Sequence, residues 1–257
     1  MSLGHGAKKS IVSYGGTPSA IYSLRQLYKY TGPILKIRRS SDNATQDFYF
    51  SGNLYGIPEQ EILDFVGVGD GYVETWYDQS GKSRHATTTN TALQPKIVSS
   101  GVMEKKNNRP TILFSGSQYL PCPTTLFGSS FGVFQRDNFQ MVISQLAAGS
   151  TYRGLFVGGA DDLYWTHSDY AYNGGELRNI SDSSSPISSA SGSLLYQATG
   201  VGTPDSQPIQ NRTHNLGYGT PSYQYLTGVI SEIVIFTTDV RVKRNYIEQD
   251  QIEYFNI

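Results

Sequence analysis

Residues 73–89 read VETWYDQSGKSRHATTT, a strand-like run that ends abruptly in a polar loop. Apolar and polar side chains alternate from Tyr72 to Tyr77, as in a half-buried β-strand. The next four residues, Asp78-Gln79-Ser80-Gly81, have the composition of a tight turn, in which the Asp side chain accepts backbone N–H groups and the glycine adopts a positive φ. The stretch therefore predicts a strand that enters a well-defined loop at one end of a sheet.

The sequence supports two interpretations of this loop. In the first it is a structural clamp, in which Arg38, Arg39 and Asp42 join Asp78 in an ion-pair network that ties two loops together at one end of a sandwich. In the second it borders a ligand groove, where polar groups hydrogen-bond sugar hydroxyls and an aromatic ring stacks on the apolar face of the sugar. The candidate ligand-binding residues are Tyr77, Asp78, Gln79, Arg84, His85, Arg39 and Asp42.

Most of the remaining chain is predicted to form short strands. Strand patterns bounded by Gly, Ser, Asn or Pro recur at 34–39, 47–51, 96–98, 111–114, 139–145, 152–157, 194–201 and 228–236. Helical spacing is confined to 19–30, 59–66 and 241–253, the last with Val242, Tyr246 and Gln249 on one stripe; residues 254–257 are typical of a final strand. Because helices are missing between most strands, the pattern predicts an all-β sandwich rather than a parallel α/β fold.

One domain, residues 17–257, is expected to follow an extended N-terminal arm. Residues 1–16, MSLGHGAKKSIVSYGG, are small or basic and show no sustained period. Residues 181–193, SDSSSPISSASGS, are of low complexity, but strand patterns resume after them. We therefore expect a long surface loop there rather than a linker between two domains.

Charge and cysteine content narrow the range of partners. The 20 Lys and Arg residues nearly balance 21 Asp and Glu residues, and a net charge of −1 would not hold a polyanion, so no nucleic-acid partner is expected. The single cysteine, Cys122, cannot form an intrachain disulfide and is expected to be a buried thiol. Since no apolar run approaches roughly 18 residues and the N-terminus has no hydrophobic secretion core, no membrane partner is expected.

Four segments in a fixed order resemble a known family. They are YSLRQLY (22–28), GPILKIRRSSDNATQDF (32–48), VETWYDQSGKSRHATTT (73–89) and QPKIV (94–98). This succession is similar to that of the catalytic module of fungal-type α-L-arabinofuranosidases, a β-sandwich. The chain also resembles bacteriophage virion and tail-associated proteins of lectin-like (laminin-G-like) fold, which share the SSDNxxxDF segment and an ending such as GVISEIVIF…IEQDQIEYFNI (228–257). Both resemblances imply a concanavalin A-like jelly-roll sandwich with a few short helices.

The similarity to arabinofuranosidases does not extend to their catalytic residues. Glycoside hydrolysis normally needs two carboxyl groups, roughly 5–5.5 Å apart in retaining enzymes. The family places its acid/base Asp in an LGIGGDN-like segment, where this chain has LGYGTPS (216–222), with Thr220-Pro221 in place of Gly-Asp. Glu176 is the one candidate for the nucleophile, and the paired cysteines of the family are absent. The resemblance therefore implies a protein that keeps the fold and lacks the catalysis.

The sequence shows no recognised motif for binding a metal or a cofactor. Asp161, Asp162 and Asp169 are candidate Ca²⁺ ligands because carboxylates suit this ion, but EF-hand spacing is missing and the sequence favours a solvated acidic loop. The four histidines, His5, His85, His167 and His214, show no metal-ligand spacing.

The leading hypothesis from the sequence is a non-enzymatic bacteriophage virion protein, placed on the capsid as decoration or associated with the tail or a fibre. Residues 1–16 would dock on other virion proteins, and the domain would be a homo-oligomer or part of a large assembly. Its outward end would contact neighbours or a host-surface glycan, and the protein would be assembled in the host cytoplasm and exposed on the particle surface. The alternatives are an arabinofuranosidase-like glycoside hydrolase and a bacterial surface carbohydrate-binding module.

Overall fold

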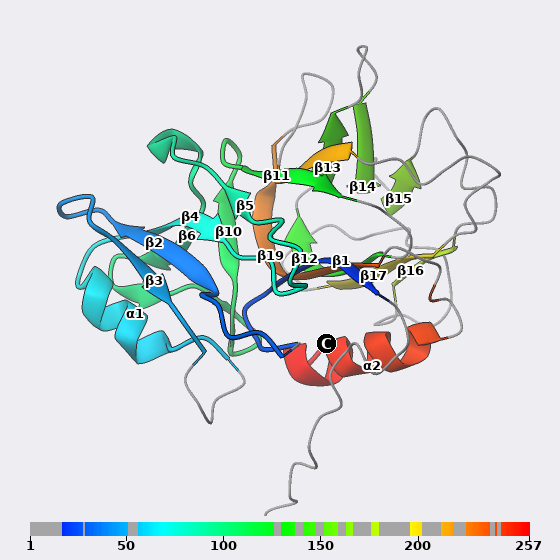
Figure 1. Ribbon diagram of the computed structural model, residues 1–257, viewed down its shortest axis with the longest axis horizontal. Helices are drawn as coiled ribbons and strands as arrows, with labels where there is room; N and C mark the ends of the chain where they lie inside the picture. The colour runs from blue at the N-terminus through cyan, green and yellow to red at the C-terminus, as the bar shows by residue number, and fades with distance from the viewer. Residues whose placement is uncertain are drawn as a thin grey trace, which may run out of the picture.

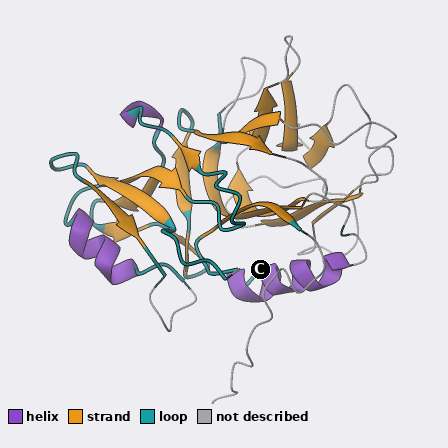
Figure 2. Cartoon of the chain, viewed as in Figure 1, coloured by secondary structure: helices purple, strands orange, loops and turns teal. Residues whose placement is uncertain are grey.

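A computed structural model shows two antiparallel β-sheets and a small two-stranded ribbon (Figures 1 and 2). The structure describes residues 17–27, 29–50, 56–125, 130–136, 141–146, 152–158, 163–166, 176–179, 196–201, 212–217, 225–236, 240 and 243–257. The strands are β1 (Pro18–Ser23), β2 (Leu35–Arg39), β3 (Thr45–Phe48), β4 (Gly71–Trp76), β5 (Ala86–Thr87), β6 (Lys96–Ser99), β7 (Val102–Met103), β8 (Lys105–Lys106), β9 (Arg109–Pro110), β10 (Ile112–Ser115), β11 (Leu120–Thr125), β12 (Ser130–Arg136), β13 (Met141–Leu146), β14 (Tyr152–Gly158), β15 (Leu163–Thr166), β16 (Glu176–Asn179), β17 (Tyr196–Val201), β18 (Arg212–Leu216) and β19 (Thr227–Phe236). The helices are α1 (Glu59–Val66), the short 3₁₀ helix η2 (Thr91–Leu93) and α2 (Arg244–Phe255).

Strand β19 is the centre of the larger sheet, which has the order β16-β17-β12-β19-β10-β6-β4-β2-β3. One edge of β19 pairs with β12. The other edge is shared, because β10 pairs with residues 227–230 and β1 pairs with residues 232–236. All of β19 after Thr227 is buried, which explains why its sequence is almost continuously apolar instead of alternating.

The two faces of β19 are covered by different elements. Ile233 lies in the core that also contains Leu216 of the smaller sheet, whose order is β11-β18-β13-β14-β15. Val234 and Phe236 point to the opposite face, where they pack with Ile247 of α2. Figure 1 shows the same layering, with the smaller sheet at the upper right and α2 below the larger sheet.

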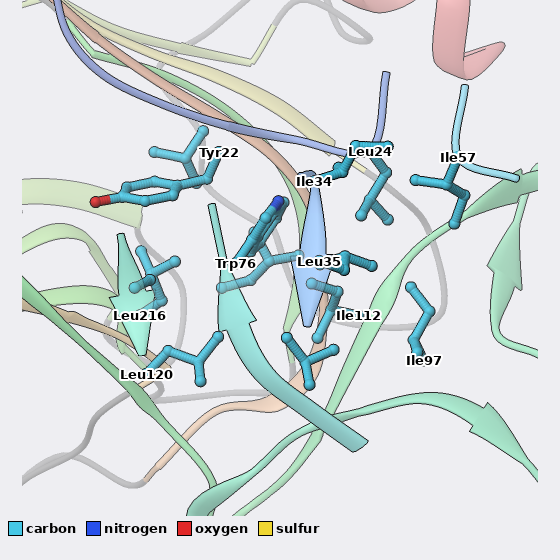
Figure 3. Close-up of a cluster of buried hydrophobic side chains, with 14 of the residues drawn as sticks. Tyr22, Leu24, Ile34, Leu35, Ile57, Trp76, Ile97, Ile112, Leu120 and Leu216 are labelled. Atoms are coloured by element: carbon cyan, nitrogen blue, oxygen red, sulfur yellow. The ribbon is translucent and has the colours of Figure 1, made fainter. Parts of the chain in front are cut away.

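Trp76, the last residue of β4, lies in the middle of the main core (Figure 3). It is fully buried, and its ring is tilted against that of Tyr22 with centroids 6.0 Å apart. Cys122 is also buried, and burial raises the pKa of its thiol to about 12, so the predicted buried thiol is confirmed. Anchoring Trp76 in this core fixes the point at which the loop after β4 begins.

The helix predicted over residues 19–30 is wrong. Residues 18–23 form strand β1, all six of them buried, and the chain then bends and makes an isolated bridge between Arg25 and Gly56. The apolar residues of this short segment fit both periods, so its pattern could not separate a helix from a buried strand. Pairing with residues 232–236 of β19, distant in sequence, decided the outcome.

Helix α1 confirms the prediction for residues 59–66, whereas the prediction for the C-terminus is partly wrong. Helix α2 continues to Phe255, so residues 254–257 do not form a strand, and Asn256 ends the helix in the left-handed conformation with φ 54°. Tyr246 and Gln249 are exposed, and the buried face of α2 is formed instead by Ile247, Glu248, Gln251 and Phe255. Because this buried face contains the polar residues Glu248 and Gln251, the pattern of apolar residues in the sequence did not reveal it.

The all-β class and most predicted strands are confirmed, with β3 beginning two residues before the predicted 47–51. The predicted arm (1–16), the low-complexity loop (181–193) and residues 241–242 lie outside the described residues. Within the ranges that the structure describes, no helix is both long and apolar enough to cross a membrane.

Candidate functional site

The carboxylate of Asp78 is the centre of the loop that follows β4. It is fully buried and accepts four hydrogen bonds. Its Oδ1 atom accepts from the backbone N–H groups of Ile21 and Ser80, each at 2.8 Å. Its Oδ2 atom accepts from the Ser80 hydroxyl at 2.7 Å and from the Arg84 N–H at 3.1 Å. Asp78 therefore satisfies backbone donors from both the loop and β1.

Gln79 holds the same segment from the other side. Its side-chain amide donates to the carbonyl oxygens of Ser23 and Arg25 at 2.9 and 3.0 Å, and its Oε1 atom accepts from the Leu27 N–H at 3.1 Å. Arg84 donates to the Ser19 carbonyl oxygen at 2.5 Å. Because a buried backbone group costs free energy unless it is paired, these bonds specify the extended path of residues 19–27.

Three of the predicted ligand-binding residues therefore have structural partners within the protein. Asp78 and Gln79 are fully buried, and Arg84 is directed at Ser19. The clamp interpretation of the loop fits these contacts, but the clamp joins the loop to β1 instead of joining it to the turn after β2.

The predicted ion-pair network among Arg38, Arg39, Asp42 and Asp78 is wrong, except for the pair between Arg39 and Asp42. Strands β2 and β4 are antiparallel, with Leu35 opposite Trp76 and Arg39 opposite Gly71, so the turn after β2 and the loop after β4 lie at opposite ends of the pair. Arg39 pairs with Asp42 at 2.7 Å on the surface, and this contact holds the pKa of the Asp42 carboxyl well below its usual range.

A surface cluster is formed instead by Tyr77 and His85 with residues that the sequence analysis did not select. The Tyr77 hydroxyl donates to Asp47 Oδ1 at 2.8 Å, and the rings of Tyr77 and His85 meet edge to face with centroids 4.8 Å apart. Tyr49 is 51 % exposed. We call Tyr30, Asp47, Tyr49, Tyr77 and His85 the tyrosine surface.

The phenols of Tyr30 and Tyr77 interact electrostatically with each other's neighbours in the tyrosine surface, Asp47 and Tyr49. Burial, followed by the interactions with Asp78, Tyr49 and Asp47 nearby, raises the pKa of Tyr30 to about 12. Burial and the hydrogen bond to Asp47 raise the pKa of Tyr77 well above its usual value. Both phenols therefore remain protonated at neutral pH. Tyr30 can donate a hydrogen bond to a ligand, whereas the Tyr77 hydroxyl donates its hydrogen to Asp47 and can only accept from a ligand.

His85 connects the tyrosine surface to the clamp, and this predicts a pH-dependent stability. Its Nδ1 atom accepts from the Asp78 N–H at 3.1 Å, and burial lowers the pKa of the imidazole despite the nearby Asp78 charge. Because the folded pKa lies below the unfolded value of about 6.5, the unfolded chain takes up the proton first and folding stability falls as the pH drops below about 6.5.

The substitution His85→Asn tests this dependence, because an amide oxygen can replace Nδ1 as acceptor without titrating. Urea unfolding between pH 7.5 and 5 is expected to give a steeper loss of unfolding free energy in the wild type than in the variant. Parallel pH profiles would show that His85 does not contribute.

The predicted catalytic and metal-binding residues lie largely beyond the described parts. Glu176 is the first residue of β16, opposite Val201 of β17, but its side chain is not described. Thr220, Pro221, Asp161, Asp162 and Asp169 lie outside the described residues. Among the side chains that are described, no group of three or more His, Cys, Asp or Glu residues could hold a metal ion.

The fold and this surface define the class of the protein: an antiparallel β-sandwich of the jelly-roll type, in which a loop clamp lies beside a group of three tyrosines, one of them exposed. No protein-family model matches the chain, and no curated protein matches it in sequence.

Solved structures with the same fold are α-L-arabinofuranosidases. A mutant GH54 α-L-arabinofuranosidase soaked with 4-nitrophenyl α-L-arabinofuranoside matches with a TM-score of 0.58 and 15 % identity. A GH54 enzyme soaked with a cyclic sulfate inhibitor matches at 0.59 and 14 %, and an arabinofuranosidase complexed with arabinofuranosyl-α-1,2-xylobiose at 0.56 and 15 %. Each match covers 93 % of this chain but only 63 % of the other. The likeness confirms the predicted jelly-roll fold.

Proposed function

We propose that this protein binds glycans through the tyrosine surface. The observation that carries the proposal is the grouping of three tyrosines with an exposed carboxylate and an imidazole on a fold shared with arabinofuranosidases. Aromatic rings stack on the apolar faces of sugars, while phenol, carboxylate and imidazole groups hydrogen-bond sugar hydroxyls. In this proposal Tyr77 and His85 contact the ligand, and their neighbours Asp78 and Gln79 hold the loop in place.

Removing an exposed ring from the tyrosine surface is expected to weaken glycan binding at least tenfold. The test is an array of arabinofuranosyl and bacterial-envelope glycans, with and without Ca²⁺, followed by titration of any glycan that binds. Tyr49→Ala removes a ring that is 51 % exposed, and Tyr246→Ala removes a ring of α2 that is 60 % exposed and serves as the matched control. Equal affinities for the two variants, or no bound glycan on the array, would count against the proposal.

Hydrolysis of arabinofuranosides is the second candidate function. It is favoured by the three arabinofuranosidase structures, although the chain spans only 63 % of their length. Turnover of a chromogenic arabinofuranoside by the wild-type chain separates a hydrolase from a protein that only binds. The virion role, with residues 1–16 docked on other virion proteins, stays a prediction from the resemblance and is compatible with glycan binding.

A further inference from the structure

A groove of about 400 Å³ opens on the outer face of the larger sheet. It is bordered by Arg38 of β2, Tyr72 of β4, Lys96 of β6 and the short helix η2, at the upper left in Figure 2. Arg38 lies two residues after Lys36 on β2, so the two side chains share one face of the sheet. Lys36 forms an ion pair with Glu74 at 2.7 Å and lies opposite Asp47 of the tyrosine surface.

The groove and the tyrosine surface therefore occupy the two ends of one continuous polar face. Tyr72 lies at the groove and Tyr77 at the tyrosine surface. Tyr77 lies five positions after Tyr72, just beyond the end of β4, which corresponds to about 17 Å of extended chain. An oligosaccharide lying along the strand could contact both ends.

The guanidinium of Arg38 is the unusual group in this groove. Arg38 is only 8 % exposed, yet it forms no ion pair with any carboxylate in the described part of the chain. Its partners are neutral: Nε donates to Gln94 Oε1 and Nη1 to Asn43 Oδ1, both at 2.7 Å, and the guanidinium lies 4.5 Å from the Tyr72 ring centroid. A buried charge normally needs a counter-charge, because desolvation is costly.

The arrangement fixes the orientation of Arg38 and leaves donors available. Gln94 is itself held, since its amide nitrogen donates to the Thr88 carbonyl oxygen at 3.1 Å. The Nη2 group of Arg38 donates to no described protein atom and is not fully enclosed, and Arg38 belongs to the lining of the groove. Two N–H groups on Nη2 and one on Nη1 thus remain for a ligand.

The rest of the groove lining also favours an anion. Lys96 adds a second cation, which is paired with Asp70 at 2.7 Å, and no carboxylate belongs to the lining that the structure describes. Gln118 also borders the groove; its Oε1 atom accepts from the Ser115 and Ser117 N–H groups, so its amide nitrogen remains to donate. The groove lining therefore offers donors and the charge of Arg38, while the charge of Lys96 is balanced by Asp70.

We infer that this groove binds the carboxylate of an acidic sugar, such as a uronic acid, as the counter-charge of Arg38. The inference rests on the proposed glycan function and adds the class of ligand. A planar carboxylate matches the two parallel N–H groups that a guanidinium presents, whereas a compact ammonium would offer only a point charge.

Calorimetric titration of the full chain with a uronic-acid oligosaccharide and with its neutral counterpart tests the inference. The wild type is expected to bind the acidic ligand at least tenfold more tightly, with a preference that weakens as salt increases. Arg38→Gln is expected to abolish the preference while keeping the affinity for the neutral ligand. Arg39→Gln is the matched control, because its neighbouring guanidinium pairs with Asp42 and stacks on Phe65 instead of lining the groove.

The possible results separate this inference from the proposed function. Equal wild-type affinity for the two oligosaccharides would overturn the acidic-sugar assignment and leave glycan binding intact. If neither oligosaccharide binds, free glucuronate and inorganic sulfate are titrated alone. Binding of glucuronate that Arg38→Gln removes would then uphold the carboxylate site although the glycan proposal fails. Sulfate bound as tightly as glucuronate would overturn the choice of a carboxylate.

Arg38→Lys controls for a change in the fold caused by Arg38→Gln. This variant keeps the positive charge but loses the two parallel N–H groups of the guanidinium, so it is expected to retain part of the preference for the acidic ligand.

Discussion

Asp78→Ala is expected to lower the free energy of unfolding by about 3–5 kcal/mol, because it removes the acceptor of several buried donors at once. The carboxylate accepts from three backbone N–H groups and one hydroxyl, and it is fully buried. A loss of this size is a large fraction of the 5–15 kcal/mol that typically stabilises a domain. Asp78→Asn keeps one carbonyl oxygen but directs an NH₂ group at a donor, so about 2 kcal/mol is expected.

Urea unfolding measures both variants, and Asp42→Ala is the matched control. Asp42 also follows a strand, accepts from a backbone N–H group and pairs with an arginine, but it is exposed. Its removal is expected to change stability by no more than the error of the measurement. Hydrogen exchange adds a local readout, because the Ile21 amide should lose protection in the Asp78 variants. Equal losses for Asp78→Ala and Asp42→Ala would show that the loop is not a clamp.

The sequence was informative where a segment's structure depends on its neighbours in the chain. The alternation in residues 72–77 and the turn chemistry of Asp78-Gln79-Ser80-Gly81 predicted a strand followed by an ordered loop, and both are present. The same segment could not reveal what the loop holds. Its partners in residues 19–27 lie more than 50 positions away in the sequence. The backbone of that segment forms hydrogen bonds with Asp78 and Gln79 instead of the internal hydrogen bonds of a helix.

The tyrosine surface could not be predicted for a related reason. Tyr77 and His85 come from the quoted loop, whereas Asp47 and Tyr49 come from β3 and the residues after it, and they meet only because β3, β2 and β4 are neighbours in the sheet. Asp47 lies inside the segment SSDNATQDF, which carried the family resemblance, so the segment was noticed but its role was not. Strand order is the missing information, since antiparallel pairing also moved Asp42 away from Asp78.

Removing one partner of the buried ion pair between Arg25 and Glu232 is expected to cost about 3–5 kcal/mol, because the remaining charge keeps its desolvation penalty. Arg25 is 3 % exposed and Glu232 is fully buried. Two hydrogen bonds of 2.7 and 3.0 Å join them, and Arg25 also pairs with Asp250 at 2.6 Å. Burial alone would lower the pKa of Arg25, but the two carboxylates outweigh it and raise the pKa above its usual value, so the charge persists.

This pair connects three elements that are distant in sequence. Glu232 lies on the face of β19 that α2 covers, and it accepts from Ser23 of β1 at 2.8 Å and from Gln251 of α2 at 3.1 Å. Arg25 stacks over the Tyr254 ring at 4.4 Å. The network explains why Gln251 of α2 is buried, and it identifies β19 as the strand on which β1 and α2 are both held.

A double-mutant cycle distinguishes the contribution of the pair from the contribution of packing. Glu232→Leu is expected to cost about 3–5 kcal/mol, whereas Arg25→Met combined with Glu232→Leu is expected to cost less than the single change, because the one charge then left without its partner, Asp250, is partly exposed. Glu74→Ala breaks the partly exposed pair with Lys36 and is expected to cost about 0–1 kcal/mol, which makes it the control. Strictly additive losses would mean that the two charges do not depend on each other, and the cores on either side of β19 would then hold β1 and α2 by apolar packing alone.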